Sequence, residues 1–149
     1  MVGANVRWGW LSAYGYLAQQ WDIFDLSLAA NLRLAKADAS DDELWQVLAE
    51  VGLHGWAKGL QQQLLTPLGE YGAGVSGGQA RRIALARLLL KQQPILILDE
   101  PFAGVDAETV ALMWQAIQTH QRHGILIVAS HQRLPETVSR HVVLNMVAG

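Results

Sequence analysis

Four consecutive aliphatic residues that end in two acids constrain the fold of this chain more than any other feature. The run Ile95–Leu98 follows Pro94 and leads directly into Asp99 and Glu100. A strand this short and this apolar is typical of a parallel sheet that is buried on both faces. Open α/β sheets bind ligands at the carboxyl ends of such strands. We therefore expect a layered α/β fold with two carboxylates at a ligand-binding edge.

The two acids suit the chemistry of a nucleoside triphosphate. Asp99 would hold Mg²⁺, directly or through water, and Glu100 would polarise the water that attacks a γ-phosphate. The alternative is that both acids only solvate the end of a strand, because Asp-Glu pairs are common. The pair by itself leaves both interpretations open.

A glycine-rich helix start lies upstream of that strand. The segment Val75–Gln79 has the spacing of a capping box and opens a helix that we expect to reach about Gln92. Ser76 supplies a hydroxyl, and Gly77 and Gly78 let backbone N–H groups approach an anion at the positive end of the helix dipole. Taken alone, such a segment is more often a capped helix start without a ligand.

The remaining sequence alternates apolar strands with amphipathic helices, which indicates one α/β domain. A second capping box pairs Ser40 with Glu43. The expected strands are 13–18, 95–98, 125–129 and 142–146, and the expected helices are 27–34, 41–51, 54–60, 77–92, 107–121 and 134–139.

Composition narrows the possible partners. Hydrophobic residues make up 51% of the chain and charged residues 16%, which fits a surface that another chain or domain covers. The net charge of −2 gives no electrostatic reason to expect nucleic acid. The chain has no cysteine, which excludes disulfides and thiolate metal sites. Its longest apolar runs are far shorter than the roughly 20 residues of a membrane-spanning helix, so another element would have to hold it at a membrane.

The glycine-rich cap and the acid-tipped strand together resemble the signature motif and the Walker B strand of the ATP-binding cassette (ABC) ATPase family, in that family's order and spacing. The resemblance covers about residues 14–149. It implies a partial P-loop NTPase-like α/β fold, with a helical signature subdomain over about 25–90. The distal half of a mostly parallel sheet core would take up about 14–24 and 91–149. ATP and Mg²⁺ are the implied cofactors.

Three further residues match motifs of the family. His131, after the strand 125–129, resembles the switch histidine that contacts the γ-phosphate. Asp106 resembles the D-loop aspartate, and it can cap the next helix at the same time. Gln19 resembles the glutamine that links the metal site to the membrane domain. Without the family context, each would be an ordinary loop, surface or capping residue.

The family pairs two cassettes head to tail, which divides these residues between two ATP sites. The resemblance implies that one set serves the ATP of a partner cassette: Ser76, Gly77, Gly78 and Gln79. Asp106 is a further residue that the resemblance implies in ATP binding. A second set would serve a P-loop in its own chain: Gln19, Asp99, Glu100 and His131, with Gln19 also near the metal. The implied reaction is in-line phosphoryl transfer to water.

The segment Thr66–Gly72 resembles the loop that exporter-type members press against their membrane helices, with Glu70 as the matching acid. This implies a transmembrane domain as partner, no nucleic acid, and a position at the cytoplasmic face of a bacterial inner membrane. Residues 28–34 and 51–74 look most like the thiol exporters that cytochrome bd assembly requires. The alternatives are a cassette protein that acts on nucleic acid or ribosomes, and an inactive fragment.

Departures from the family pattern carry their own expectations. The sequence contains no G-x-x-x-x-G-K-[ST], and its first lysine is Lys36, so we expect the chain to begin after the P-loop and to bind MgATP poorly alone. Ala18 replaces the usual proline beside Gln19, which we expect to be a mild change. Ala103 replaces the usual D-loop serine, and we expect this to weaken coupling between the two ATP sites.

Overall fold

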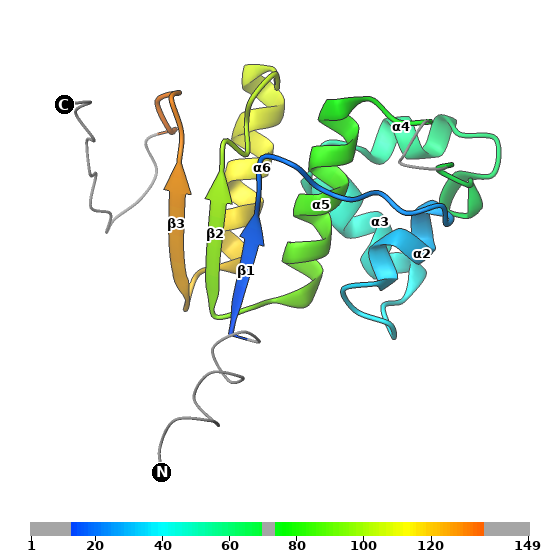
Figure 1. The fold of residues 1–149 in the computed structure, drawn as a ribbon, viewed down its shortest axis with the longest axis horizontal. Helices are drawn as coiled ribbons and strands as arrows, with labels where there is room; N and C mark the ends of the chain where they lie inside the picture. The colour runs from blue at the N-terminus through cyan, green and yellow to red at the C-terminus, as the bar shows by residue number, and fades with distance from the viewer. Residues whose placement is uncertain (1–12, 70–73, 136–149) are drawn as a thin grey trace, which may run out of the picture.

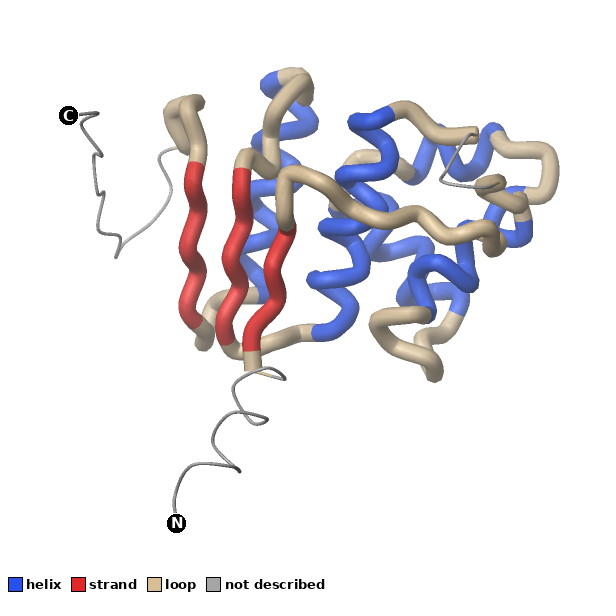
Figure 2. Tube along the Cα trace, viewed as in Figure 1, coloured by secondary structure: helices blue, strands red, loops and turns tan. Residues whose placement is uncertain are grey.

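The computed structural model describes residues 13–69 and 74–135. They form a three-stranded sheet with helices packed behind and beside it (Figures 1 and 2). Strands β1 (Tyr14–Leu17), β2 (Ile95–Asp99) and β3 (Ile125–Ala129) are parallel and lie in that order. The expected parallel α/β architecture is confirmed for this part of the chain.

The register of the sheet brings the three strand ends to one edge. Leu17 pairs with Leu98, and Asp99 pairs with Ala129. The loops that follow the strands therefore leave side by side, at the upper edge in Figure 1. Gln19 stands two residues beyond β1, and His131 stands two residues beyond β3.

The helices match the expected ones to within two residues at each end. They are α2 (Leu28–Arg33), α3 (Asp41–Glu50), α4 (His54–Gly59), α5 (Gly77–Lys91) and α6 (Ala107–His120), with one unexpected 3₁₀ turn, η1 (Gln63–Leu65). Both expected capping boxes are present, Ser40 with Glu43 and Ser76 with Gln79. Glu70, the expected strand 142–146 and most of the expected helix 134–139 lie outside the described residues.

Helix α5 is the central element, because it packs against β1 on one side and against α2 and α3 on the other. Its apolar residues Ile83, Leu85 and Leu89 are buried. Gly15 in β1 permits this close packing, since a Cβ there would lie 3.0 Å from a Leu88 methyl group and from the Gln93 side-chain oxygen. Helix α5 runs against the strand direction, so its N-terminus lies at the same end of the molecule as the strand ends (Figure 1).

Helix α6 lies behind the sheet in Figure 1 and connects β2 to β3. Phe102 and Trp114 stack edge to face at 6.0 Å, in the core behind β2. The His120 ring nitrogen lies 2.8 Å from a Glu50 carboxylate oxygen, which ties the end of α6 to the end of α3.

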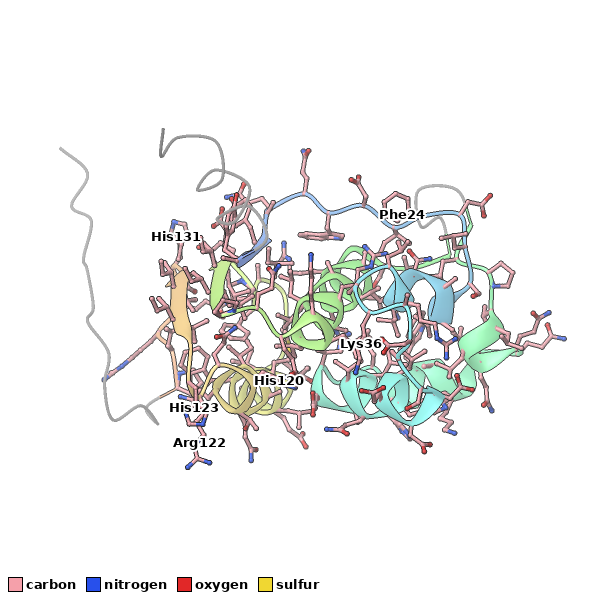
Figure 3. The ribbon with its side chains drawn as sticks, turned by 90° about the horizontal axis from the view of Figure 1, so that it is seen from below. Phe24, Lys36, His120, Arg122, His123 and His131 are labelled. Carbon is pink, nitrogen blue, oxygen red and sulfur yellow. The ribbon has the colours of Figure 1, made fainter. Side chains whose placement is uncertain are left out.

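The sequence predicts burial of the strand 95–98 on both faces, but the structure buries it fully on one face only, since Ile95 and Ile97 are partly exposed. Leu96 and Leu98 point to the helices and are buried. The opposite face carries Ile125 and Ile127, whose exposures are 57% and 51%. The described helices α5 and α6 lie on one face only (Figures 1 and 3), so the other face keeps its apolar side chains exposed. Within the described ranges, no helix combines the length and apolarity needed to cross a membrane.

Candidate functional site

The N-terminus of α5 is held by a reciprocal capping box. The Ser76 hydroxyl accepts a hydrogen bond from the Gln79 backbone N–H at 3.2 Å, and the Gln79 side-chain oxygen accepts one from the Ser76 N–H at 2.9 Å. In both bonds the side chain acts only as the acceptor, through its oxygen atom. The hydroxyl hydrogen of Ser76 and the amide hydrogens of Gln79 therefore remain able to donate, beside the positive end of the helix dipole.

The two glycines of this helix start face open space. A Cβ built on Gly77 or on Gly78 meets no atom within 4 Å. Neither residue has a positive φ, so neither needs glycine for its backbone conformation. Glycine in a helix is less favourable than alanine by about 1 kcal/mol. No packing contact in the described part of the chain explains why glycine stands at these two positions. Close approach of an outside group to the backbone would explain it, because such an approach requires residues without a Cβ.

Glu100 and His131, which the family resemblance assigned to one ATP site, meet at the carboxyl edge of the sheet. The Glu100 carboxylate accepts a hydrogen bond from the His131 backbone N–H at 2.8 Å and also contacts the imidazole Nδ1. The His131 side chain is 96% exposed, whereas that of Glu100 is 18% exposed. Among the described residues the imidazole is therefore open to solvent beside the sheet edge (Figure 3 labels His131).

Glu100 adopts an unusual backbone conformation, with φ of +48°. Non-glycine residues rarely enter this left-handed region, and they stay there only when surrounding contacts fix them. Here the Glu100 N–H donates to the Ala129 carbonyl at 2.9 Å, and the side chain bonds to His131. The strained backbone turns the carboxylate away from the strand direction and toward the loop after β3.

The donor chemistry at this edge fits magnesium. Asp99 ends β2, and Gln19 follows the neighbouring strand β1. Carboxylate and amide oxygens are the hard ligands that Mg²⁺ prefers, and Mg²⁺ takes only one or two protein ligands besides phosphate and water. No group of three or more acidic, histidine or cysteine side chains gathers around one point in the described residues. Asp99 and Gln19 thus supply carboxylate and amide oxygen atoms at neighbouring strand ends, which is the donor chemistry that Mg²⁺ prefers.

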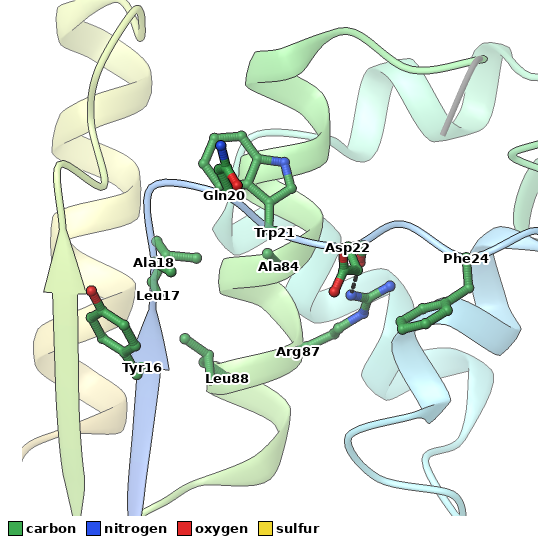
Figure 4. Close-up of a pocket in the computed structure, with 10 residues that line it drawn as sticks. All are labelled: Tyr16, Leu17, Ala18, Gln20, Trp21, Asp22, Phe24, Ala84, Arg87 and Leu88. Atoms are coloured by element: carbon green, nitrogen blue, oxygen red, sulfur yellow. Dashed lines mark hydrogen bonds between the residues drawn. The ribbon is translucent and has the colours of Figure 1, made fainter. Parts of the chain in front are cut away.

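The loop after β1, residues 18–24, crosses the face of α5 and lines a pocket of about 260 Å³ (Figure 4). We call this segment the glutamine loop. Arg87 of α5 fastens it, because its guanidinium donates to the Asp22 carbonyl at 2.6 Å and to the Asn31 carbonyl at 2.8 Å. Burial lowers the pKa of Arg87 from its usual value, although the nearby Asp22 carboxylate acts in the opposite direction. The arginine stays charged throughout the physiological range.

Asp106 caps α6 at the end of the D-loop (residues 103–106). Its carboxylate accepts a hydrogen bond from the Thr109 N–H at 2.8 Å, and this bond is the main cause that lowers its pKa. The capping role considered for Asp106 is thus present. Arg82 of α5 bonds to the Gly52 carbonyl at 3.0 Å, and burial lowers its pKa.

The structure brings Glu100 and His131 into contact and places Gln19 and Asp99 at the same edge. The start of α5 and the start of α6, which Asp106 caps, lie at that end of the molecule (Figure 1). Sequence reasoning missed Asn31 and Arg87. Asn31 is completely buried, and its amide donates to the Phe24 carbonyl at 3.0 Å. A lone polar residue within the apolar stretch 28–32 was the available signal for Asn31.

Comparison with known proteins supplies an independent view of these motifs. A family model described as ABC transporter matches residues 5–103. The mitochondrial potassium channel ATP-binding subunit of Mus musculus is 32% identical over 145 residues, which are 97% of this chain and 20% of that protein. The glutathione/L-cysteine transport system ATP-binding/permease protein CydD of Bacillus subtilis (strain 168) is 36% identical over 133 residues, which are 89% of this chain and 23% of that protein.

A solved structure of a bacterial Atm1-family ABC exporter with ATP bound superposes with a TM-score of 0.75 at 27% identity. The match covers 81% of this chain and 21% of that chain. The described sheet and helices therefore have the fold of part of that exporter. This chain spans about a fifth of the length of the relatives it matches.

Proposed function

Because the chain belongs to the ABC transporter family, we propose that it forms part of the ATP-binding domain of an exporter and completes the ATP site of a second such domain. The observation that carries this proposal is the start of α5. Gly77 and Gly78 stand in a capped helix terminus, face open space and have no use within the described part of the chain. Backbone N–H groups at a helix start are suited to bind phosphate.

In this proposal the residues divide between two sites, as the head-to-tail pairing implies. The N–H groups at Gly77 and Gly78, with the Ser76 hydroxyl and the Gln79 amide, donate to the γ-phosphate of the ATP that the second domain holds. Asp106 lies in the D-loop, next to that site. Residues 25–90 form the helical subdomain, and the remaining described residues belong to the catalytic core.

The other site is served by the carboxyl edge of the sheet. Glu100 accepts a proton from the attacking water, and His131 donates to the γ-phosphate through its exposed imidazole. Asp99 and Gln19 would hold Mg²⁺, which neutralises phosphate charge when it is bound. The 149 residues contain no P-loop motif, so these side chains act on an ATP whose phosphates are bound by other residues.

A complementation assay tests the proposal. The partner is an ABC exporter ATP-binding domain that keeps its P-loop but carries an inactivated signature motif, so that its own homodimer does not hydrolyse ATP. Titration with this chain is expected to restore hydrolysis to a saturable plateau. Gly77→Asp places a carboxylate against the γ-phosphate and is expected to abolish this restoration, because like charges repel in a closed site.

Two further variants assign each motif to its site. Glu100→Gln is expected to leave the restored rate nearly unchanged, because the restored site takes its base from the partner. Gly55→Asp, on the exposed side of α4, is the matched control for an added carboxylate. A chain that never restores hydrolysis refutes the proposed function, and equal loss from Glu100→Gln and Gly77→Asp refutes the division into two sites.

We place the exporter at the cytoplasmic face of a bacterial inner membrane, and within the exporters we assign it to those that move thiols. The likeness of residues 28–34 and 51–74 to thiol exporters carries this narrower class. Overall identity does not separate the classes, since the Bacillus subtilis protein named as a glutathione/L-cysteine transport system and a lipid A-core flippase of Colwellia psychrerythraea are each 36% identical. The test is a chimera in which residues 14–135 replace the matching segment of a thiol exporter or of a lipid A-core flippase. Transport is measured in membrane vesicles. The first chimera is expected to keep thiol export, and the second is expected to lose lipid A-core flipping. Equal function in both would remove support for the thiol class.

A further inference from the structure

The side chain of Arg81 joins three segments that surround the start of α5. Arg81 stands in the helix turn that follows Gly77 and Gly78. Its Nη1 donates a hydrogen bond to the Ala103 carbonyl of the D-loop at 2.8 Å. Its guanidinium carbon lies 4.6 Å from the ring centroid of Trp21 in the glutamine loop. One side chain therefore connects α5 to both loops.

The geometry uses properties that only arginine has. The edge of a guanidinium donates hydrogen bonds while its flat face stacks on an aromatic ring, so one group can serve both contacts at once. Trp21 lies across the side of α5 (Figure 4), which presents its ring to this face. The partners are a backbone carbonyl and a ring rather than a carboxylate. The contact thus fixes the position of two loops without forming an ion pair.

This arrangement also has a cost. The Nε atom of Arg81 is buried and has no hydrogen-bond partner among the described residues. A buried donor that is left unpaired destabilises a fold. A side chain without this nitrogen would avoid the cost, so stability alone does not explain an arginine at this position. The contacts that Arg81 makes with the D-loop and the glutamine loop are the property that explains it.

The three segments carry the residues assigned to the two ATP sites. Trp21 is two residues from Gln19, and Ala103 lies midway between Glu100 and Asp106. We propose that Arg81 is a positioning residue that holds the D-loop and the glutamine loop to the first turns of α5, so that the α5 start meets the partner's γ-phosphate in a fixed geometry. The proposal rests on the proposed function. Displacement of catalytic donors by as little as 1 Å can cost a large factor in rate.

The complementation assay can separate positioning from folding. A variant that only unfolds part of the population lowers the concentration of competent chain, so its titration midpoint shifts and its plateau returns when more chain is added. A variant that misplaces the D-loop keeps the midpoint and lowers the plateau. Arg81→Met is expected to lower the plateau about fivefold. Arg81→Lys, which keeps the charge but reaches only one partner, is expected to fall in between.

Variants of the ring and a matched arginine complete the design. Trp21→Leu is expected to lower the plateau about as much as Arg81→Met, and the double variant no further, because both remove one shared contact. Trp21→Phe keeps an aromatic face and is expected to recover most of the plateau. Arg33→Met is the control, since Arg33 also donates to a backbone carbonyl, that of Ala39, but far from both loops. Additive effects of the two single variants would overturn the proposal.

Amide hydrogen exchange on the chain alone gives a second measurement. The Ala103 and Val105 N–H groups are hydrogen-bonded within the 100–105 turn, so they report on the D-loop. Arg81→Met and Trp21→Leu are expected to speed their exchange about tenfold, while the Leu85 amide in α5 stays protected. Unchanged exchange at Ala103 and Val105 would overturn the proposal. If the wild-type chain fails to stimulate the partner, the proposed function fails, and the exchange measurement still decides whether Arg81 holds the D-loop.

Discussion

Replacing Gly77 and Gly78 by alanine should make the chain more stable and at the same time prevent it from completing an ATP site. Both residues lie in the first turn of α5 without positive φ, and an added Cβ meets nothing within 4 Å. Alanine loses less backbone entropy on folding than glycine does. In a monomeric chain nothing opposes the substitution, whereas in a closed ATP site two methyl groups would stand where phosphate oxygens must approach.

The size of the stability gain follows from helix propensity. Each replacement is worth about 0.5–1 kcal/mol, so the double variant should gain about 1–2 kcal/mol. For a chain of this length, 1 kcal/mol shifts the melting temperature by about 2–4 °C, which gives a rise of roughly 2–8 °C. Urea unfolding followed by circular dichroism measures the free energy of unfolding directly. In the complementation assay the plateau rate should fall by about tenfold or more.

Gly55→Ala is the matched control for this prediction. Gly55 also lies in a helix, α4, and its added Cβ also meets nothing within 4 Å. Its replacement should raise stability by a similar amount and leave the plateau unchanged. A Gly77→Ala, Gly78→Ala variant that is less stable than wild type would show that the glycines serve their own chain. A variant that is more stable and fully active would show that no phosphate approaches them.

Three more predictions follow from the same geometry. Gly52→Ala should destabilise the chain by about 1–3 kcal/mol in urea unfolding, because Gly52 has φ of +70° and its Cβ would lie 2.7 Å from a Thr109 methyl group; unchanged stability would contradict the packing described between α3 and α6. The capping hydrogen bond lowers the pKa of the Asp106 carboxyl group. The stabilisation that this carboxylate gives the folded chain is therefore present above the unfolded pKa of about 3.9 and is lost as pH falls through the lower folded pKa. The difference in unfolding free energy between wild type and Asp106→Asn should therefore shrink below about pH 4, and a difference that grows there would refute it. A polypeptide of these 149 residues contains no P-loop motif and should not retain MgATP in equilibrium dialysis at micromolar concentration, whereas saturable binding there would refute this.

The sequence predicted the local features of the fold well, because they depend on residues close together in the chain. The capping boxes at Ser40 and Ser76 need only a spacing of three residues, and both are present. The strand Ile95–Asp99 follows from its apolar run and from Pro94. Glu100 and His131 are 31 residues apart, and it was the family resemblance, not the local sequence, that assigned them to one ATP site.

The sequence could not predict contacts between distant segments. Arg81 and Ala103 are 22 residues apart, and Arg87 reaches the Asp22 carbonyl across 65 residues. The helical period placed Arg81 off the apolar face of α5, which is correct, but a position off that face does not say which loop will cover it. Burial on both faces was also inferred for the strand 95–98, from its apolar run. Ile125 and Ile127 remain exposed because burial depends on which elements cover the sheet, and the strand sequence carries no information about that.

Several features that break local rules lie near the carboxyl edge of the sheet and the start of α5. Gly77 and Gly78 weaken the helix that they start, Glu100 holds a left-handed backbone, and Arg81 buries an unpaired N–H. Each of these costs free energy, by about 1–3 kcal/mol for a strained non-glycine backbone or an unpaired buried donor. Not every such feature lies there, because Gln63 and Gln92 also have a positive φ and the Thr66 hydroxyl is also buried without a partner among the described residues. Where strain and unpaired donors do gather at one edge, they mark residues that a ligand or partner would use, and the carboxyl edge of this sheet with the start of α5 is such a place.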